Sequence, residues 1–104
     1  MNGRYIEVDG KPVPCEDLME WGTWFEKADR EVAKHIVNGI RVSTIFLGLD
    51  HGFGGKLLLY ETMTFNDRTT KEVSGLKPFV EIQKRYATRA EAIIGHGEVI
   101  DEIK

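Results

Sequence analysis

The sequence predicts a small α+β domain, in which an antiparallel sheet of about five strands carries two helices packed on one face. Two observations lead to this fold class. An Asn-Gly pair stands between two β-rich runs, and two other segments repeat apolar residues at helical spacing. The chain has 104 residues, a length that suits one domain. Hydrophobic residues make up 41% and charged residues 30%, as in globular proteins, and so we expect one domain over residues 1–104.

The central hairpin is the clearest local prediction. Residues 32–37 and 40–49 are β-rich, and between them lie Asn38 and Gly39, the pair that favours positive φ at both centres of a type I′ turn. A two-residue turn of this type fixes the register of the two strands that it joins. The residues predicted to face each other are Val37 and Ile40, His35 and Val42, and Ala33 and Thr44.

Three further strands follow from alternation, β-rich composition and the turn residues around them. They cover residues 4–8, 57–65 and 81–87. Pro12 and Pro14 are expected to stiffen a loop after the first of these strands. Residues 66–81 are polar and show no sustained period, and so we expect a long loop or an insertion there.

Two helices are predicted, over residues 16–28 and from Thr88 to the C-terminus. The apolar stripe of the first is formed by Leu18, Trp21, Phe25 and Ala28, with Trp24 beside it. Trp21 and Trp24 are expected to pack in the core, with one of them partly exposed as an anchor for a partner. The second helix begins with a capping box of Thr88 and Glu91. Its predicted core face holds Ala92, Ile93, His96, Val99, Ile100 and Ile103.

Composition excludes several classes of protein. The formal net charge of −3 argues against a nonspecific nucleic-acid binder, which needs a basic face. A single cysteine, Cys15, excludes an internal disulfide and a multi-cysteine zinc site, and it fits a reducing compartment. We expect a cytoplasmic protein without a membrane partner, because the N-terminus lacks a secretory h-region and the apolar runs are short. The three histidines show no ligand spacing, and we expect no metal and no cofactor.

The best candidate for a binding site is the glycine-rich segment of residues 49–56. Its glycines, among them Gly54, let the backbone approach a ligand, Phe53 could stack on a base, and Lys56 could meet an anion. The segment is neither a P-loop nor a dinucleotide fingerprint. The alternative is a simple hairpin loop whose Phe53 folds back onto the core. The predicted ligand-binding residues are Arg41, Asp50, His51, Phe53, Gly54, Lys56 and Glu61.

Two titratable residues lie within apolar surroundings. Glu61 is a carboxylate in an otherwise apolar strand, and if buried it needs a partner, for which Arg41 or His96 could serve. We expect a structural ion pair there. His96 is expected to be a core histidine with one hydrogen bond.

Several stretches together resemble a family of small uncharacterised proteins encoded by bacteriophages and prophages. The similarity rests on Val42-Ser43-Thr44-Ile45-Phe46-Leu47-Gly48-Leu49-Asp50-His51, on Leu59-Tyr60-Glu61-Thr62-Met63, and on Arg85-Tyr86-Ala87-Thr88 with Glu91-Ala92 and Gly95-His96. The resemblance covers most of the chain and departs at residues 66–81. It implies a phage accessory protein that is expressed inside a bacterium, a setting in which inhibition of host defence is a common role.

Three functions remain open at this point. The first is a noncatalytic phage-type binding protein that captures a nucleotide-like signal or a bacterial host protein, and that inhibits antiviral defence; a homodimer is compatible with this function. The second is a small enzyme that uses Glu61, His51 and Asp50 in acid–base roles on a phosphate-containing substrate. The third is a structural accessory protein without a ligand.

Overall fold

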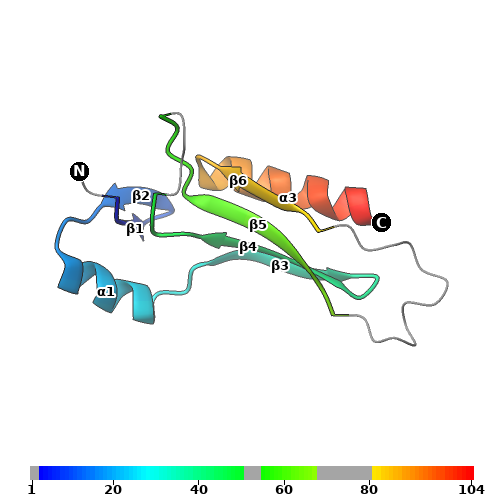
Figure 1. Ribbon diagram of the computed structural model, residues 1–104, viewed down its shortest axis with the longest axis horizontal. Coiled ribbons are helices and arrows are strands. Elements are labelled where there is room, and N and C mark those ends of the chain that lie inside the picture. The colour runs from blue at the N-terminus through cyan, green and yellow to red at the C-terminus, as the bar shows by residue number, and fades with distance from the viewer. Residues whose placement is uncertain (1–2, 51–54, 68–80) are drawn as a thin grey trace.

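The computed structural model describes residues 3–50, 55–67 and 81–104. Within these residues the chain forms two helices and six strands in two antiparallel sheets, and the predicted α+β class is confirmed (Figure 1). The prediction of about five strands in one sheet differs from this arrangement, because the N-terminal part of the chain forms a separate two-stranded sheet. The elements are β1 (Tyr5–Val8), β2 (Lys11–Pro14), α1 (Leu18–Lys27), β3 (Glu31–Val37), β4 (Ile40–Phe46), β5 (Tyr60–Asn66), β6 (Gln83–Tyr86) and α3 (Arg89–Ile103).

The larger sheet is antiparallel with the strand order β3-β4-β5-β6. Its first turn has the predicted geometry, since Asn38 has a φ of 53° and Gly39 a φ of 77°. The predicted register is also confirmed, because the hairpin pairs Val37 with Ile40, His35 with Val42, and Ala33 with Thr44.

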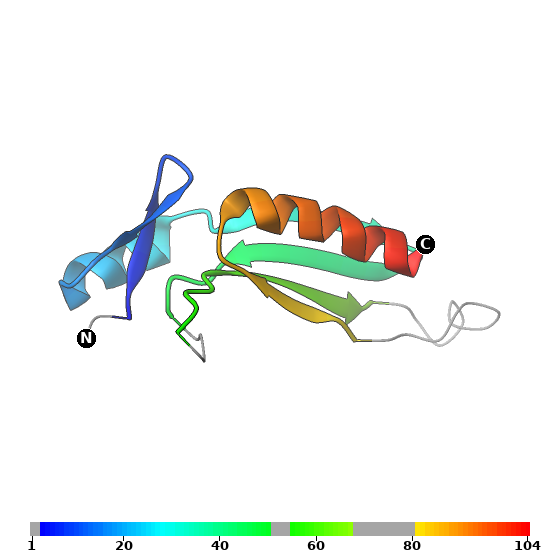
Figure 2. The same cartoon turned by 90° about the horizontal axis from the view of Figure 1, so that it is seen from above.

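Helix α3 covers one face of this sheet (Figure 2). The pleat of β4 points Ile40, Val42, Thr44 and Phe46 toward the helix, and all four are buried. The helix begins at the predicted cap, where the Thr88 side chain accepts a hydrogen bond from the Glu91 amide. Its buried residues are Ala92, Gly95, His96 and Val99. Ile93 does not belong to this face as predicted, because 53% of it is exposed.

The N-terminal hairpin is built by residues that the sequence analysis assigned partly to a loop. Pro12 and Pro14 lie in β2, which pairs antiparallel with β1. Asp9 and Gly10, with φ of 51° and 78°, form the turn between these strands. Prolines are compatible with a two-stranded ribbon, because each strand there has an unpaired edge.

Helix α1 packs against β1 and lies beyond the end of the four-stranded sheet, so α3 alone lies along the face of that sheet (Figure 2). Asp17 caps α1, and its side chain accepts hydrogen bonds from the amides of Met19 and Glu20 at 2.9 and 3.1 Å. The Trp21 indole donates to the carbonyl oxygens of Tyr5 and Gly48, both at 3.1 Å. These bonds fix the helix to the hairpin and to the chain that follows β4.

Candidate functional site

The predicted site residues that the structure describes lie in three separate places. Arg41 is at the start of β4, where it forms an ion pair with Asp67 at 2.9 Å and lies over the Phe65 ring at 4.3 Å. Asp50 follows the opposite end of β4, and its amide donates to the Gly3 carbonyl oxygen at 2.7 Å. Strand β4 separates the two residues by roughly 20 Å. Arg41 therefore does not join Asp50 in one pocket.

Glu61 forms the predicted structural ion pair, but with a different partner. Its carboxylate accepts hydrogen bonds from Arg85 at 2.9 Å and from Gln83 at 2.7 Å. The prediction of Arg41 or His96 as its partner is wrong. Glu61 is opposite Arg85 in the sheet, and its side chain points to the face that α3 does not cover. Since 8% of the side chain is exposed, the two donors compensate its burial.

The glycine-rich loop is described only at its two ends. His51, Phe53 and Gly54 lie outside the described residues, while Lys56 is exposed beside Gly55, which has a φ of 83°. A ligand site in this loop therefore stays a prediction.

A chain of four polar side chains lies between α3 and the sheet, and the sequence analysis had no signal for it beyond the expectation of a core histidine. His35 Nδ1 is 2.9 Å from His96 Nε2, and His96 Nδ1 is 2.7 Å from the Thr44 hydroxyl. That hydroxyl is hydrogen-bonded to the hydroxyl of Thr62. Burial, and secondarily the neighbouring His35, lower the pKa of His96.

This polar chain is suited to specifying the packing of α3 rather than to catalysis. Thr44 and Thr62 are fully buried, so a substrate cannot reach their hydroxyls while the helix is in place. The hydrogen bonds satisfy the buried polar groups of Thr44, Thr62 and His96, and the chain ends at His35, which is exposed. Among the described residues, no three His, Cys, Asp or Glu side chains are grouped as metal ligands would be.

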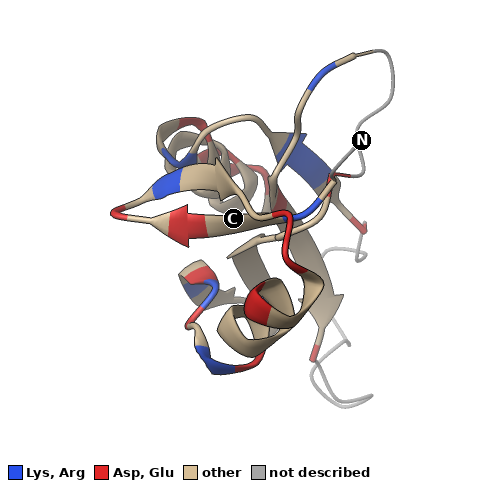
Figure 3. Ribbon diagram, turned by 90° about the vertical axis from the view of Figure 1, so that its left-hand side faces the viewer, with Lys and Arg blue, Asp and Glu red and all other residues tan. Residues whose placement is uncertain are grey.

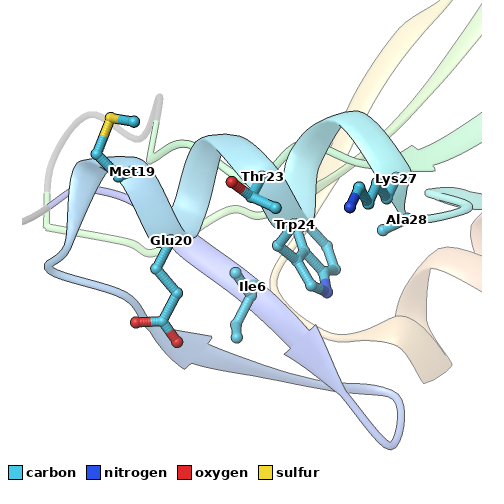
Figure 4. A pocket seen from close by; sticks show the side chains of 7 residues that line it. All are labelled: Ile6, Met19, Glu20, Thr23, Trp24, Lys27 and Ala28. Carbon is cyan, nitrogen blue, oxygen red and sulfur yellow. The ribbon is translucent and has the colours of Figure 1, made fainter.

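A groove with a volume of about 600 Å³ lies between α1 and β1. Figure 4 shows that Trp24 and Ile6 lie next to each other between the helix and the strand. The remaining lining residues all come from α1 or its C-cap: Met19, Glu20, Thr23, Lys27 and Ala28. We refer to these seven residues as the α1 groove.

Two apolar side chains at the start of α1 are exposed. Met19 is 78% exposed, and the neighbouring Leu18 is 59% exposed. Glu20 and Lys27 add one charge of each sign, two helical turns apart (Figure 4). Figure 3 faces this end of the molecule and shows acidic and basic segments along α1. Exposed apolar surface rimmed by polar groups is typical of interaction sites.

The two tryptophans of α1 have different roles. Trp21 is held by its hydrogen bonds to Tyr5 and Gly48. Trp24 meets Phe46 edge to face, with the ring centroids 5.7 Å apart, and also lines the groove. Trp24 is therefore the residue that links the core to the groove.

Comparisons with known proteins give no relative: no family model matches the chain, and no curated protein or solved structure matches it either. No helix among residues 3–50, 55–67 and 81–104 is long and apolar enough to cross a membrane. The candidate site is therefore defined by its geometry alone.

Proposed function

We propose that this protein is a noncatalytic binding protein of the bacteriophage accessory class, which captures a bacterial host protein and thereby inhibits antiviral defence. The captured element is an amphipathic helix that docks in the α1 groove. The observation that carries this proposal is the groove itself, an apolar depression of about 600 Å³ beside a methionine that is 78% exposed. The phage setting and the defence target are supported by the sequence resemblance to phage-encoded proteins.

A helix suits the groove better than a nucleotide does. Docking of an amphipathic helix in an apolar groove is a common mode of recognition, and methionine adapts to varied apolar partners. A nucleotide needs several donors or cations around its phosphates, whereas the groove offers one cation, Lys27, and one carboxylate, Glu20. The two charges favour a docked helix with a basic residue near Glu20 and an acidic residue near Lys27, about 10 Å apart along its axis.

Of the residues that the acid–base alternative would use, Glu61 is held in structural contacts, while His51 lies outside the described residues. Glu61, which an acid–base mechanism would use, is bound to Arg85 and Gln83. His96 is bound to His35 and Thr44. Both residues are buried and serve the packing of the sheet, so neither is available to a substrate at the surface.

Selection from a displayed library of helical peptides tests the proposal and does not require the partner to be identified first. We expect enrichment of amphipathic peptides whose binding weakens at least tenfold on Met19→Asp, because a carboxylate then lies on the apolar contact. The matched control is Ile94→Asp, since Ile94 is also an exposed apolar residue on a helix (66% exposed), but it lies on α3 and does not line the groove. Peptides that bind Met19→Asp as well as the parent protein would overturn the proposal.

The defence target is tested in bacteria that carry individual antiviral systems. Expression of the parent protein is expected to restore plaque formation by a sensitive phage on at least one such strain. Met19→Asp should lose this effect and Ile94→Asp should keep it. Equal activity of the two variants would show that inhibition does not use the α1 groove.

A further inference from the structure

The two sides of the α1 groove are connected to each other through the core of the protein. Trp24 meets Phe46 edge to face at a centroid distance of 5.7 Å, and the Phe46 ring lies 5.3 Å from that of Tyr60. The Tyr60 hydroxyl donates a hydrogen bond to the Glu7 carboxylate at 2.6 Å. Glu7 is the neighbour of Ile6 in β1, and Ile6 lines the groove as Trp24 does. This series of contacts therefore begins and ends in the groove.

Glu7 joins β1 to both the larger sheet and α3. Neighbouring side chains of a strand point to opposite sides, so Ile6 faces the groove and Glu7 faces the interior, where 11% of its side chain is exposed. Its two oxygens accept hydrogen bonds from Arg89 Nη1, both at 3.0 Å. Arg89 is the first residue of α3, and the fully buried Tyr60 is the first residue of β5. These charge-assisted hydrogen bonds compensate the burial of the carboxylate.

The orientation of the N-terminal hairpin depends on this carboxylate. The start of β1 is fixed by the Tyr5 amide, which donates to the Gly48 carbonyl oxygen at 2.9 Å. Further along β1, the side-chain hydrogen bonds that join the described part of the strand to β5 and α3 all end on Glu7. Arg89 also lies against the turn of the hairpin, because a Cβ atom added to Gly10 would be 3.6 Å from its Cδ atom. Glu7 is thus the second attachment, which fixes the direction of the strand.

We propose that Glu7 is a positioning residue of the α1 groove, whose bonds to Tyr60 and Arg89 hold the β1 side of the groove in the place that a docked helix requires. This inference rests on the proposed function of the groove as a helix-docking site. Without these bonds β1 can adopt several positions, and only molecules with β1 in place bind the helix. The apparent affinity then falls in proportion to the fraction of such molecules.

Glu61 provides a matched control, because it is a second buried carboxylate with partners of the same kind. It is 8% exposed, and it accepts hydrogen bonds from Arg85 at 2.9 Å and from Gln83 at 2.7 Å. It lies on the face of the larger sheet that α3 does not cover, and it does not line the groove. Glu7→Ala and Glu61→Ala should therefore both destabilise the protein, while only Glu7→Ala should change the groove.

Two measurements follow the groove in these variants. The first is the NOE between the methyl groups of Ile6 and the indole ring of Trp24 in the protein without peptide, since the two side chains lie next to each other (Figure 4). Glu7→Ala should lose most of this NOE, and Glu61→Ala should keep it. The second is the affinity for a helical peptide selected on the parent protein. It should fall about tenfold in Glu7→Ala, through loss of charge-assisted hydrogen bonds, and by less than about threefold in Glu61→Ala.

Two milder variants repeat the comparison and keep the test decisive if an alanine variant does not fold. Tyr60→Phe and Gln83→Met each remove the uncharged donor from one of the two buried carboxylates and leave its arginine in place. Tyr60→Phe should weaken the NOE and lower the peptide affinity about fivefold, as expected for one hydrogen bond. Gln83→Met should leave both unchanged.

The outcomes separate the positioning role from helix capture. An NOE that neither Glu7→Ala nor Tyr60→Phe weakens, or equal losses of peptide affinity in the Glu7 and Glu61 variants, overturns the positioning role. If the peptides still depend on Met19 in that case, helix capture stands without it. If no helical peptide binds the parent protein, helix capture is overturned. An NOE that is lost in Glu7→Ala and kept in Glu61→Ala then still supports Glu7 as the residue that positions β1.

Discussion

Replacing either of two glycines of α3 by alanine should have opposite effects on stability, although they are only two residues apart. A Cβ atom at Gly95 would lie 2.2 Å from Cζ of Tyr86 and 2.3 Å from its Cε1 and Oη atoms. Ordinary contact distances are about 3.5–4.0 Å, so the ring would have to move by more than 1 Å. Tyr86 is packed against the cluster of Phe46, Leu59, Tyr60 and Ala92, which leaves little room for that movement.

The net effect at Gly95 follows from two opposing contributions. Overpacking costs about 1–3 kcal/mol, and the contact of three ring atoms places this site near the upper end. Alanine regains about 1 kcal/mol of helix propensity. We therefore expect Gly95→Ala to lower the free energy of unfolding by about 2 kcal/mol.

Gly97→Ala is the matched control, because a Cβ atom at Gly97 would meet nothing within 4 Å. Only the gain in helix propensity remains there, and the variant should be more stable by about 0.5–1 kcal/mol. Urea denaturation of the three proteins measures both changes. If both variants shift the unfolding midpoint in the same direction, the packing of α3 against Tyr86 is wrong.

Three further predictions concern the turn, the buried histidine and the buried ion pair. Gly39→Val forces a β-branched residue to a φ of 77° and should destabilise the protein by about 1–3 kcal/mol; an unchanged melting midpoint would contradict the turn assignment. Burial lowers the pKa of His96 below its ordinary value, and so the folded protein favours the neutral imidazole ring. The stability that the neutral ring contributes is complete above about pH 6.5 and is lost as the pH falls further. The urea midpoint should therefore decrease from pH 7 to pH 5 more steeply for the parent protein than for His96→Asn, and equal slopes would exclude this assignment. Arg85→Met leaves the carboxylate of Glu61 buried without its cation and should lower the free energy of unfolding by about 1–3 kcal/mol. The additional change Glu61→Leu should recover most of this loss, and chemical denaturation of the single and double variants measures both effects. A double variant less stable than Arg85→Met would refute the prediction of a buried ion pair.

The parts of the fold that follow local rules could be predicted from the sequence. The Asn38 and Gly39 turn fixes the register of the central hairpin, and Thr88 fixes the start of α3, because each depends on a few neighbouring residues. The prolines of β2 misled the prediction, since proline is unfavourable in a central strand but is accepted in a two-stranded ribbon. The position of α1 beyond the end of the sheet depends on contacts of Trp21 with residues distant in sequence, and no periodic pattern encodes these contacts.

The candidate site was harder to predict than the fold. The polar residues that suggested a site, Arg41 and Glu61, have structural ion pairs whose partners depend on sheet register. The α1 groove depends on which side of an amphipathic helix the hairpin leaves uncovered, a property of the tertiary arrangement. The sequence signal that could have indicated it was the expectation that one of Trp21 and Trp24 is partly exposed as an anchor, and the tryptophan that lines the groove is Trp24.

The most direct test of the account compares the two indole signals of α1 by NMR while a selected helical peptide is added. Trp24 lines the groove, whereas the indole of Trp21 is hydrogen-bonded to Tyr5 and Gly48. Docking in the groove predicts that the indole N–H resonance of Trp24 shifts on titration and that the resonance of Trp21 remains nearly unchanged. If the Trp24 resonance does not respond at saturating peptide, the partner binds elsewhere and the α1 groove is not the functional site.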